Sequence, residues 1–375
     1  MASHFYLSEK DYSFTMGLTV GKHLRNLSGP ILITGHTGFK GTWLTLLLEQ
    51  LEVPVIGLSL PPEEESLFDR AKRTGVIPEE FIDIRDPSAV SKFLSVFQPS
   101  AVIHMAAQPL VFESYKNPRE TFETNVMGTV NLLDASFQTN SIEAIVVVTT
   151  DKVYRNDNSG QVFVEVDPLE GKDPYSASKV GTESVVAAWR QIAKVSGGPK
   201  VVSVRAGNVI GGGDWAKNRL IPDLIRGITS GVPIQIRNPQ STRPWQHVLD
   251  PLKGYLMALE EILLGGDFEG LNFGPITKSL SVREIVEQCQ NYWPFPFEAD
   301  YGRDMVKSQL EAIELHLDST LARSALKWNP TWDQSESIKS TFEWWNKVLN
   351  SSISPTQACM SDIEFLLQAN NDGLP

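Results

Sequence analysis

The chain has 375 residues, enough for one large domain or two, and hydrophobic and charged residues make up 41% and 21% of it. This is ordinary globular usage, which argues against intrinsic disorder. Lys and Arg number 33 against 45 Asp and Glu, which leaves a net charge of −12 without any basic cluster. We therefore expect no binding to nucleic acid or to an anionic membrane.

The two cysteines, Cys289 and Cys359, are far apart, and the sequence has no Cys-x-x-Cys or Cys/His cluster. We therefore expect no disulfide framework and no metal site. Residues 1–28 lack the apolar run of a secretory signal, and no apolar run is long enough to span a bilayer. These features predict a cytoplasmic protein.

Short apolar runs alternate with helical patterns through the first half of the chain. Strands are predicted at 30–34, 53–58, 81–84, 101–104, 144–149 and 201–204, and helices at 43–51, 87–97, 118–138 and 174–194. This alternation is typical of parallel strands covered by helices on both faces. We therefore expect an α/β fold in which residues 29–205 form a doubly wound parallel sheet of the Rossmann type.

Beyond residue 205 the alternation weakens, and Gly, Pro and Trp become frequent. We expect a smaller C-terminal, substrate-binding part over 206–348, with some of 247–274 returning to the sheet. Residues 1–28 form an N-terminal extension in this scheme. Residues 349–375 form a polar tail that we expect to be loosely ordered.

The first motif, Gly35-x-x-Gly38-x-x-Gly41, follows the first predicted strand and opens its helix. Gly35 permits a tight turn, Gly38 lets the backbone approach a pyrophosphate, and Gly41 lets helix and strand pack closely. The free N–H groups of the helix then face the phosphates. Three glycines also suit an ordinary turn, but the strand–turn–helix context favours a dinucleotide site.

A ribose-binding acid is expected about 20 residues further on, but the second strand ends at Ser59 without a carboxylate. It also lacks an arginine for a 2′-phosphate, and the acidic run 63–65 would repel one. NAD is therefore favoured over NADP. Asp83 and Ile84 end the third predicted strand, where Asp83 either meets the adenine or serves in a turn.

The second motif places Tyr175 and Lys179 at a spacing of four, on one face of a predicted helix. A neighbouring ammonium lowers the pKa of a phenol from about 10, which lets the tyrosine take a proton from a substrate hydroxyl. Tyr6 and Lys10 have the same spacing but precede every predicted strand. The context therefore favours Tyr175.

The third motif, Thr150-Asp151-Lys152, leaves the end of the apolar strand 144–149. Ligands of open α/β sheets bind outside the carboxyl ends of the strands, so these side chains are well placed to act on a substrate. A solvated turn with an Asp–Lys surface pair accounts for the same residues equally well.

In this order, the three motifs resemble the extended short-chain dehydrogenase/reductase family. The resemblance covers about residues 30–345. Supporting segments are His104-Met105-Ala106-Ala107-Gln108, Asn125-Val126-Met127-Gly128-Thr129, Arg205-Ala206-Gly207-Asn208-Val209 and Arg243-Pro244-Trp245-Gln246-His247-Val248. Thr150-Asp151-Lys152 resembles the signature of the nucleotide-sugar 4,6-dehydratases within that family, and the flanking segments are similar to its CDP-glucose branch.

The resemblance implies NAD as cofactor and the conversion of CDP-D-glucose to CDP-4-dehydro-6-deoxy-D-glucose and water. C4 is oxidised, water leaves across C5 and C6, and the hydride returns to C6. Tyr175, helped by Lys179 and Thr150, is implied as the base at the C4 hydroxyl, Lys152 as the base at C5, and Asp151 as the acid at C6. Relatives pair through the helices at 118–138 and 174–194, which implies a homodimer or a higher homo-oligomer.

The resemblance also implies two sets of binding residues. The cofactor set is Gly35, Thr37, Gly38, Phe39, Gly41, Ser59, Asp83, Ile84, Ala106, Ala107, Tyr175 and Lys179. The substrate set is Gln108, Asn208, Arg219, Arg237 and Arg243, of which Arg237 and Arg243 could instead be surface ion-pair residues.

Three alternatives stay open. A nucleotide-sugar 4-epimerase uses the same scaffold but lacks an acid and a base beside the threonine. A UDP-sugar 4,6-dehydratase is also possible, because the Asp-Lys pair occurs in some UDP-N-acetylglucosamine dehydratases. A non-catalytic NAD-binding regulator would be expected to have lost Tyr175, Lys179 or Asp151, and all three are present.

Overall fold

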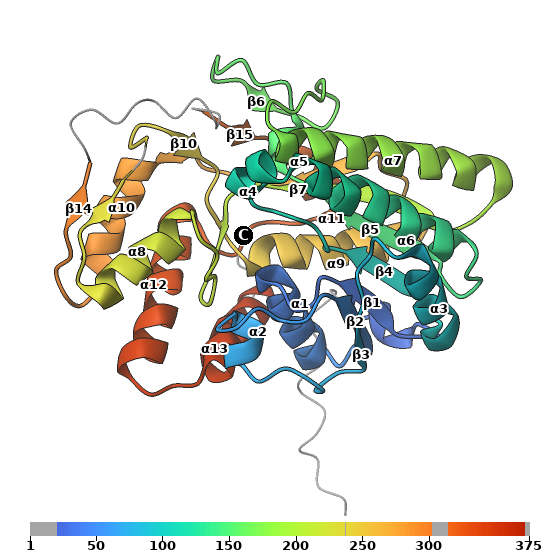
Figure 1. The fold of residues 1–375 in the computed structure, drawn as a ribbon, viewed down its shortest axis with the longest axis horizontal. Coiled ribbons are helices and arrows are strands. Elements are labelled where there is room, and N and C mark those ends of the chain that lie inside the picture. The colour runs from blue at the N-terminus through green and yellow to red at the C-terminus, as the bar shows by residue number, and fades with distance from the viewer. Residues whose placement is uncertain (1–20, 237, 302–313, 372–375) are drawn as a thin grey trace, which may run out of the picture.

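The computed structural model describes residues 21–236, 238–301 and 314–371. Its centre is a seven-stranded parallel sheet in the order β12-β7-β5-β4-β1-β2-β3 (Figure 1). The strands are β1 (Ile31–Thr34), β2 (Val55–Ser59), β3 (Glu79–Phe81), β4 (Ala101–His104), β5 (Ala144–Val148), β7 (Lys200–Ala206) and β12 (Gly270–Phe273). The predicted fold class, a doubly wound sheet of the Rossmann type, is confirmed.

Helices cover both faces of this sheet. They are α1 (Phe39–Gln50), α2 (Leu67–Arg70), α3 (Pro87–Phe97), α4 (Val111–Lys116), α5 (Pro118–Phe122), α6 (Gly128–Phe137), α7 (Pro174–Ser196) and α9 (Leu249–Leu263). Because successive strand residues point to opposite faces, Ile31 and Ile33 pack into the core that contains α1 and α9. Leu32, between them, packs into the core that contains α3 and α6.

The remaining elements are short strand pairs and further helices, of which α8, α10 and α12 lie together on the left of Figure 1. The strands are β6 (Val162–Phe163), β8 (Val209–Ile210), β9 (Ile234–Gln235), β10 (Thr242–Arg243), β11 (Gln246–His247), β13 (Leu280–Ser281), β14 (Ala299–Asp300) and β15 (His316–Leu317). The helices are α8 (Leu220–Ser230), α10 (Val282–Tyr292), α11 (Thr320–Leu326), α12 (Gln334–Asn350) and α13 (Pro355–Asn371). Between these short strands, the chain returns to the sheet, where β12 pairs in parallel with β7.

The single helix predicted over 118–138 is interrupted. A π-helical segment, η2 (Glu123–Met127), separates α5 from α6. The backbone oxygen of Asn125 in this segment accepts hydrogen bonds from the hydroxyls of Thr129 and Thr182, at 2.7 and 2.8 Å. Two side-chain hydroxyls thus bind a backbone carbonyl oxygen at the point where the helix is irregular. One of them comes from α7, and the spacing of apolar residues along the chain does not predict such a tertiary contact.

Two further expectations need correction. The third strand ends at Phe81, so Asp83 and Ile84 follow it rather than belong to it. The polar tail contains α13, a helix rather than loosely ordered chain. Cys359, Ile363 and Leu366 are buried in the main core at helical spacing, which explains why this segment is ordered despite its polar composition.

Candidate active site

The glycine loop between β1 and α1 requires glycine at two positions. Gly35 has a φ of +73°, and a Cβ there would lie 2.8 Å from the backbone nitrogen of Ala106. A Cβ on Gly41 would lie 2.2 Å from the backbone oxygen of Gly35. The loop therefore holds its tight turn only with small residues, as the motif predicts.

The loop and its surroundings fit a dinucleotide. Gly38 is the N-cap of α1 and no side chain caps the helix, so the N–H groups of the first turn, which starts at Phe39, are open to an anion. The hydroxyls of Thr37 and Ser59 are 2.9 Å apart, which joins the loop to the end of β2. Ala106, which the turn at Gly35 approaches, and Ala107 follow β4 with small side chains.

Asp83 and Ile84 are engaged within the protein. Asp83 accepts hydrogen bonds from the backbone N–H of Arg85 at 2.9 Å and from its guanidinium at 2.6 Å. The Arg85 guanidinium therefore holds the pKa of that carboxyl below its usual range. Ile84 is buried against Gly128, where a Cβ would lie 2.5 Å from the Ile84 Cδ1. Asp83 thus has the turn role, and its contact with adenine stays a prediction.

The third motif lies directly beyond β5. Thr150 is the N-cap of the short helix η3 (Asp151–Val153), and its hydroxyl donates to Asp151 Oδ1 at 3.0 Å. Lys152 Nζ lies 3.5 Å from the same oxygen. Asp151 is fully buried, and its Oδ2 has no hydrogen-bond partner among the described residues. The alternative of a solvated Asp–Lys surface pair is therefore wrong.

The second motif opens α7, which begins with a capping box at Asp173. Tyr175 and Lys179 are both buried. Lys179 Nζ donates to the backbone oxygen of Val148 at 3.0 Å, so the amine is fixed at the end of β5. The Tyr175 phenol lies close enough to Thr150, Asp151 and Lys152 for all three to influence its pKa. The structure thus brings the second and third motifs into one site.

Burial controls the protonation of this site. It raises the pKa of Tyr175, while the positive charge of Lys152 and the nearby Thr150 hydroxyl oppose the rise. The predicted lowering of the phenol pKa is therefore wrong, because desolvation of the phenolate outweighs the neighbouring charge. Burial also lowers the pKa of Lys179 to about 8, against the raising effect of Glu183.

The predicted substrate residues fall into different surroundings. Arg219 is the N-cap of α8, pairs with Asp214 at 3.0 Å, and its charge acts on the Tyr175 phenol. Arg243 is buried in β10. Asn208 has a buried Oδ1 without a hydrogen-bond partner among the described residues. Arg237 lies outside the residues that the structure describes.

Gln108 has its amide committed to the protein. Its Nε2 donates to the hydroxyl of Thr121 at 2.9 Å, and its Oε1 accepts from the backbone N–H of Leu110 at 2.6 Å. Its backbone N–H donates to Asn125 Oδ1 at 2.8 Å. These bonds shape the loop after β4, and a contact between Gln108 and substrate stays a prediction.

Lys40 is a site residue that the sequence reasoning did not single out. Its Nζ donates to the hydroxyl of Tyr255 on α9 at 3.1 Å. Burial, with the charges of Arg219 and Lys179, lowers its pKa to about 7, against an opposing effect of Asp151. Its place in the first turn of α1 is a usable signal, because helical side chains there point back toward the N-terminus. Nothing in the sequence marks Tyr255.

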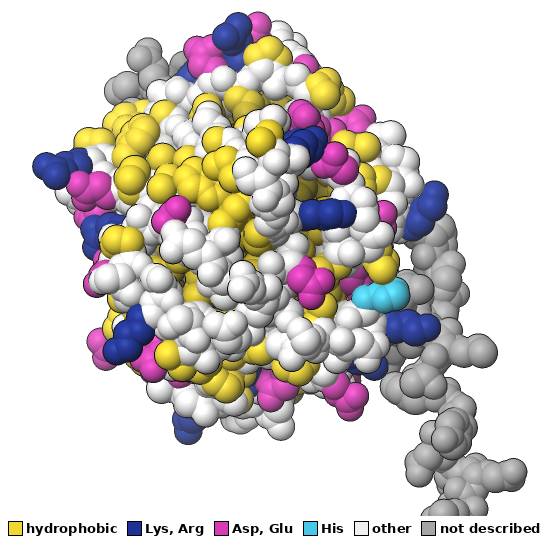
Figure 2. Space-filling view, turned by 90° about the vertical axis from the view of Figure 1, so that its right-hand side faces the viewer, with side chains coloured by type: hydrophobic (Ala, Val, Ile, Leu, Met, Phe, Trp, Pro, Cys, Tyr) yellow, Lys and Arg dark blue, Asp and Glu magenta, His cyan; other side chains and the backbone are white. Residues whose placement is uncertain are grey.

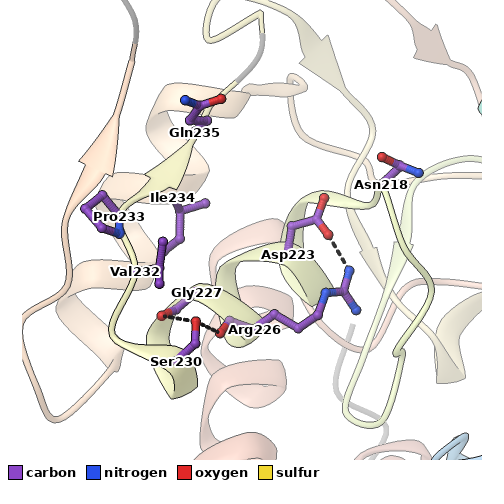
Figure 3. A pocket seen from close by; sticks show the side chains of 9 residues that line it. All are labelled: Asn218, Asp223, Arg226, Gly227, Ser230, Val232, Pro233, Ile234 and Gln235. Atoms are coloured by element: carbon purple, nitrogen blue, oxygen red, sulfur yellow. Dashed lines mark hydrogen bonds and ion pairs between the residues drawn. The ribbon is translucent and has the colours of Figure 1, made fainter.

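A pocket of about 500 Å³ lies between α8 and β9 (Figure 3). Its polar lining comes from Asn218, Asp223, Arg226, Ser230 and Gln235. Figure 3 shows Asp223 and Arg226 pointing toward each other, and they form an ion pair. Asn218 directly precedes Arg219 in the chain, so the pocket and the cationic end of the candidate site share one loop.

Comparisons with known proteins agree with this geometry. Residues 31–274 match the model of the NAD dependent epimerase/dehydratase family. The chain is 42% identical over 323 residues to the CDP-glucose 4,6-dehydratase of Salmonella typhimurium, covering 84% of this chain and 89% of that relative. It is 30% identical to a UDP-glucose 4-epimerase of Rhizobium leguminosarum, covering 71% and 84% of the two chains.

Solved structures with a similar fold also include dehydratases and epimerases. The dTDP-glucose 4,6-dehydratase of Streptomyces venezuelae, solved with NAD, superposes with a TM-score of 0.74 at 24% identity, covering 87% of this chain and 99% of that one. The UDP-glucose 4-epimerase of Thermus thermophilus, also solved with NAD, gives a TM-score of 0.73 at 24% identity, covering 84% and 98%.

Fold and site together define an NAD-dependent enzyme with a tyrosine–lysine pair. The chain belongs to the NAD-dependent epimerase/dehydratase family. This membership confirms the predicted cofactor, NAD, and the resemblance to the dehydratases and epimerases that act on nucleotide sugars. Within the described ranges, no helix combines the length and apolar character needed to cross a bilayer.

Proposed function

We propose that the protein is a nucleotide-sugar 4,6-dehydratase that converts CDP-D-glucose to CDP-4-dehydro-6-deoxy-D-glucose and water. The observation that carries this proposal is the pair formed by the buried Asp151 and the partly exposed Lys152, both of which influence the pKa of the Tyr175 phenol. Elimination of water needs an acid and a second base beside the tyrosine, whereas C4 epimerisation needs neither. The Salmonella relative carries the name of this activity.

The side chains of the site supply the proton transfers. Bound NAD would supply the hydride acceptor for C4 and, once reduced, the hydride donor for C6, so turnover would have no net redox change. Tyr175 Oη, as the phenolate, takes the proton of the C4 hydroxyl; the positive charges of Lys152 and Arg219 favour the phenolate against the effect of burial. Transfer of one proton from Lys152 Nζ to Asp151 Oδ1, 3.5 Å away, would give the neutral amine and the protonated acid that elimination needs. Lys152 Nζ then removes the C5 proton that the C4 ketone acidifies, and later returns a proton to C5. The Asp151 carboxyl gives its proton to the C6 hydroxyl, which leaves as water.

We propose that the two ligands occupy opposite ends of the site. The glycine loop and the open N-terminus of α1 suit the cofactor pyrophosphate. Arg219, Arg243 and Asn208, all within the proposed substrate-binding part 206–348, suit the nucleotide diphosphate and sugar. The support is the charge of Arg219 at the Tyr175 phenol and the unpartnered Oδ1 of Asn208. The pocket beside Arg219 suits the nucleoside.

A panel of substrates tests the function. Purified protein is incubated with CDP-, dTDP-, UDP- and GDP-glucose, and the products are identified by NMR and mass spectrometry. We expect a 4-keto-6-deoxy sugar, formed fastest from CDP-glucose. A C4 epimer as the only product would contradict the dehydratase assignment, and no reaction with any of the four would favour a non-catalytic regulator.

We propose that the protein is a homodimer that pairs through α5, η2 and α7. Large apolar side chains on these elements are exposed: Phe122, Met127, Ile192 and Val195. Figure 2 shows apolar side chains gathered into one area on the side of the molecule where α3, α6 and the end of α7 lie. Such exposed areas mark association surfaces more often than they mark free surface.

The charged substitution Met127→Asp is expected to shift the protein from dimer to monomer, because it would bury a carboxylate in an apolar interface. Light scattering coupled to size-exclusion chromatography measures the mass. Val166→Asp, at a side chain 89% exposed, is the matched control and should leave the mass unchanged. A monomeric wild-type protein would contradict the proposal.

We also propose a cytoplasmic location. Cys289 and Cys359 are both free thiols, and both are buried. Burial raises the pKa of each thiol well above its ordinary value, which makes these cysteines unreactive. Two isolated, buried thiols are typical of proteins in a reducing compartment.

A further inference from the structure

Next to the candidate catalytic loop lies a buried carboxylate, that of Glu183, and each of its two oxygens accepts two hydrogen bonds from the protein. Glu183, one turn after Lys179 on α7, accepts hydrogen bonds on Oε1 from the Thr149 hydroxyl at 2.5 Å and from Arg205 Nε at 2.8 Å. Its Oε2 accepts from the Ser203 hydroxyl at 2.7 Å and from Arg205 Nη2 at 2.9 Å. Glu183 therefore joins α7 to the ends of β5 and β7.

The other side of Arg205 continues this network to the far end of the loop. Arg205 Nη1 donates to the Tyr154 hydroxyl at 2.9 Å and to the backbone oxygen of Glu165 at 3.0 Å. The Tyr154 hydroxyl donates to Asn272 Oδ1 on β12 at 2.7 Å. The guanidinium also lies 5.2 Å from the centre of the Tyr154 ring.

The network therefore holds the residues on both sides of the third motif. Thr149 immediately precedes Thr150, and Tyr154 follows Val153, the last residue of η3. Glu183 and Arg205 are both buried, and desolvation makes such pairs weak contributors to net stability. Their bidentate, fully satisfied geometry is suited to fixing the position of a loop.

We propose that Glu183 and Arg205 are positioning residues, which hold Thr150, Asp151 and Lys152 against Tyr175 and Lys179 without touching the substrate. This inference rests on the proposed dehydratase function. Displacement of a catalytic group by about 1 Å can cost about a hundredfold in rate, so a loop that carries three such groups needs rigid support.

Glu183 has a second link to the site through its charge. It raises the pKa of Lys179, opposing the effect of burial. Among the described residues, Lys40 of α1 and His104 of β4 also lie near the Lys179 amine, whose charge lowers the pKa of each. Loss of the Glu183 charge therefore lowers the pKa of Lys179, and any loss of activity that follows from deprotonation of this amine moves to lower pH.

Two isosteric variants separate geometry from charge. Glu183→Gln is expected to lower kcat roughly tenfold to hundredfold, with KM near the wild-type value, and to move the basic limb of the kcat–pH profile to lower pH. Thr149→Val removes only the hydroxyl that binds Glu183, so kcat should fall while the basic limb stays in place. Glu260→Gln, at a buried carboxylate of α9 that accepts from the backbone of His23, is the control.

The assay uses the nucleotide sugar that the wild-type enzyme accepts, with circular dichroism to measure the folded fraction. Wild-type protein without dehydratase activity would overturn the proposed function itself. If the wild type is active, the positioning role alone is overturned by one result. That result is that Glu183→Gln and Thr149→Val both have the kcat and the pH profile of the control Glu260→Gln. If Glu183→Gln does not fold, a wild-type kcat in Thr149→Val overturns the positioning role by itself.

Discussion

Tyr175→Phe is expected to lower kcat by about two to four orders of magnitude, the range that one positioned acid–base group contributes. The phenol hydroxyl is the atom that takes the proton from the C4 hydroxyl in the proposed reaction. Thr150, Lys152 and Arg219 all lie close enough to influence its pKa. Because the ring itself remains, the fold and the affinity for NAD should change little.

The measurement for this variant is steady-state turnover together with the affinity for NAD. Tyr292→Phe, which removes a hydroxyl from α10 far along the chain from the motifs, is the matched control and should keep wild-type turnover. Turnover of the Tyr175→Phe variant within a few-fold of wild type would show that another group takes the proton.

Lys152→Ala is expected to oxidise C4 but not to eliminate water. Tyr175, Thr150 and Lys179 remain in this variant, so the first proton transfer stays possible, whereas the base at C5 is missing. The immediate product should therefore be the 4-keto sugar that still carries its C6 hydroxyl, in at most one equivalent per site, because its hydride would stay on the cofactor. Borodeuteride reduction traps this ketone with deuterium at C4, and mass spectrometry shows whether one water has been lost.

The control for this variant is Lys200→Ala, at an exposed lysine that starts β7. It should give the dehydrated product at the wild-type rate. Full dehydration by the Lys152→Ala protein would remove Lys152 as the base. Loss of C4 oxidation as well would mean that the ammonium of Lys152 also supports the Tyr175 phenol, consistent with its effect on that group.

Local patterns in the sequence predict the sheet and the placement of the three motifs. The glycine spacing in the first loop is required by the close packing of one turn, because a Cβ on Gly41 would lie 2.2 Å from a backbone oxygen. The buried strand at 144–148 is apolar throughout, and the polar residues after it mark its carboxyl end. Such patterns involve residues that are close together in the sequence, so they can be recognised without a structure.

Tertiary contacts account for what the sequence does not predict. Lys40 meets Tyr255 from 215 positions away, and no local pattern connects them. The pKa of Tyr175 is raised because the phenol is deeply buried, and the spacing between Tyr175 and Lys179 in the sequence does not predict that burial. The sequence does not indicate the bond of Arg205 to Glu183, because arginine is mostly exposed in proteins and nothing nearby in the chain marks this one as buried.

Transfer of label within one sugar tests the central claim most directly. CDP-glucose that carries deuterium at C4 is converted to completion, and the position of the deuterium is read by NMR. We expect deuterium on the C6 methyl group of the product, because one hexose faces one cofactor while Tyr175, Asp151 and Lys152 move its protons. Deuterium lost to solvent, or an unlabelled C6 methyl, would contradict the account.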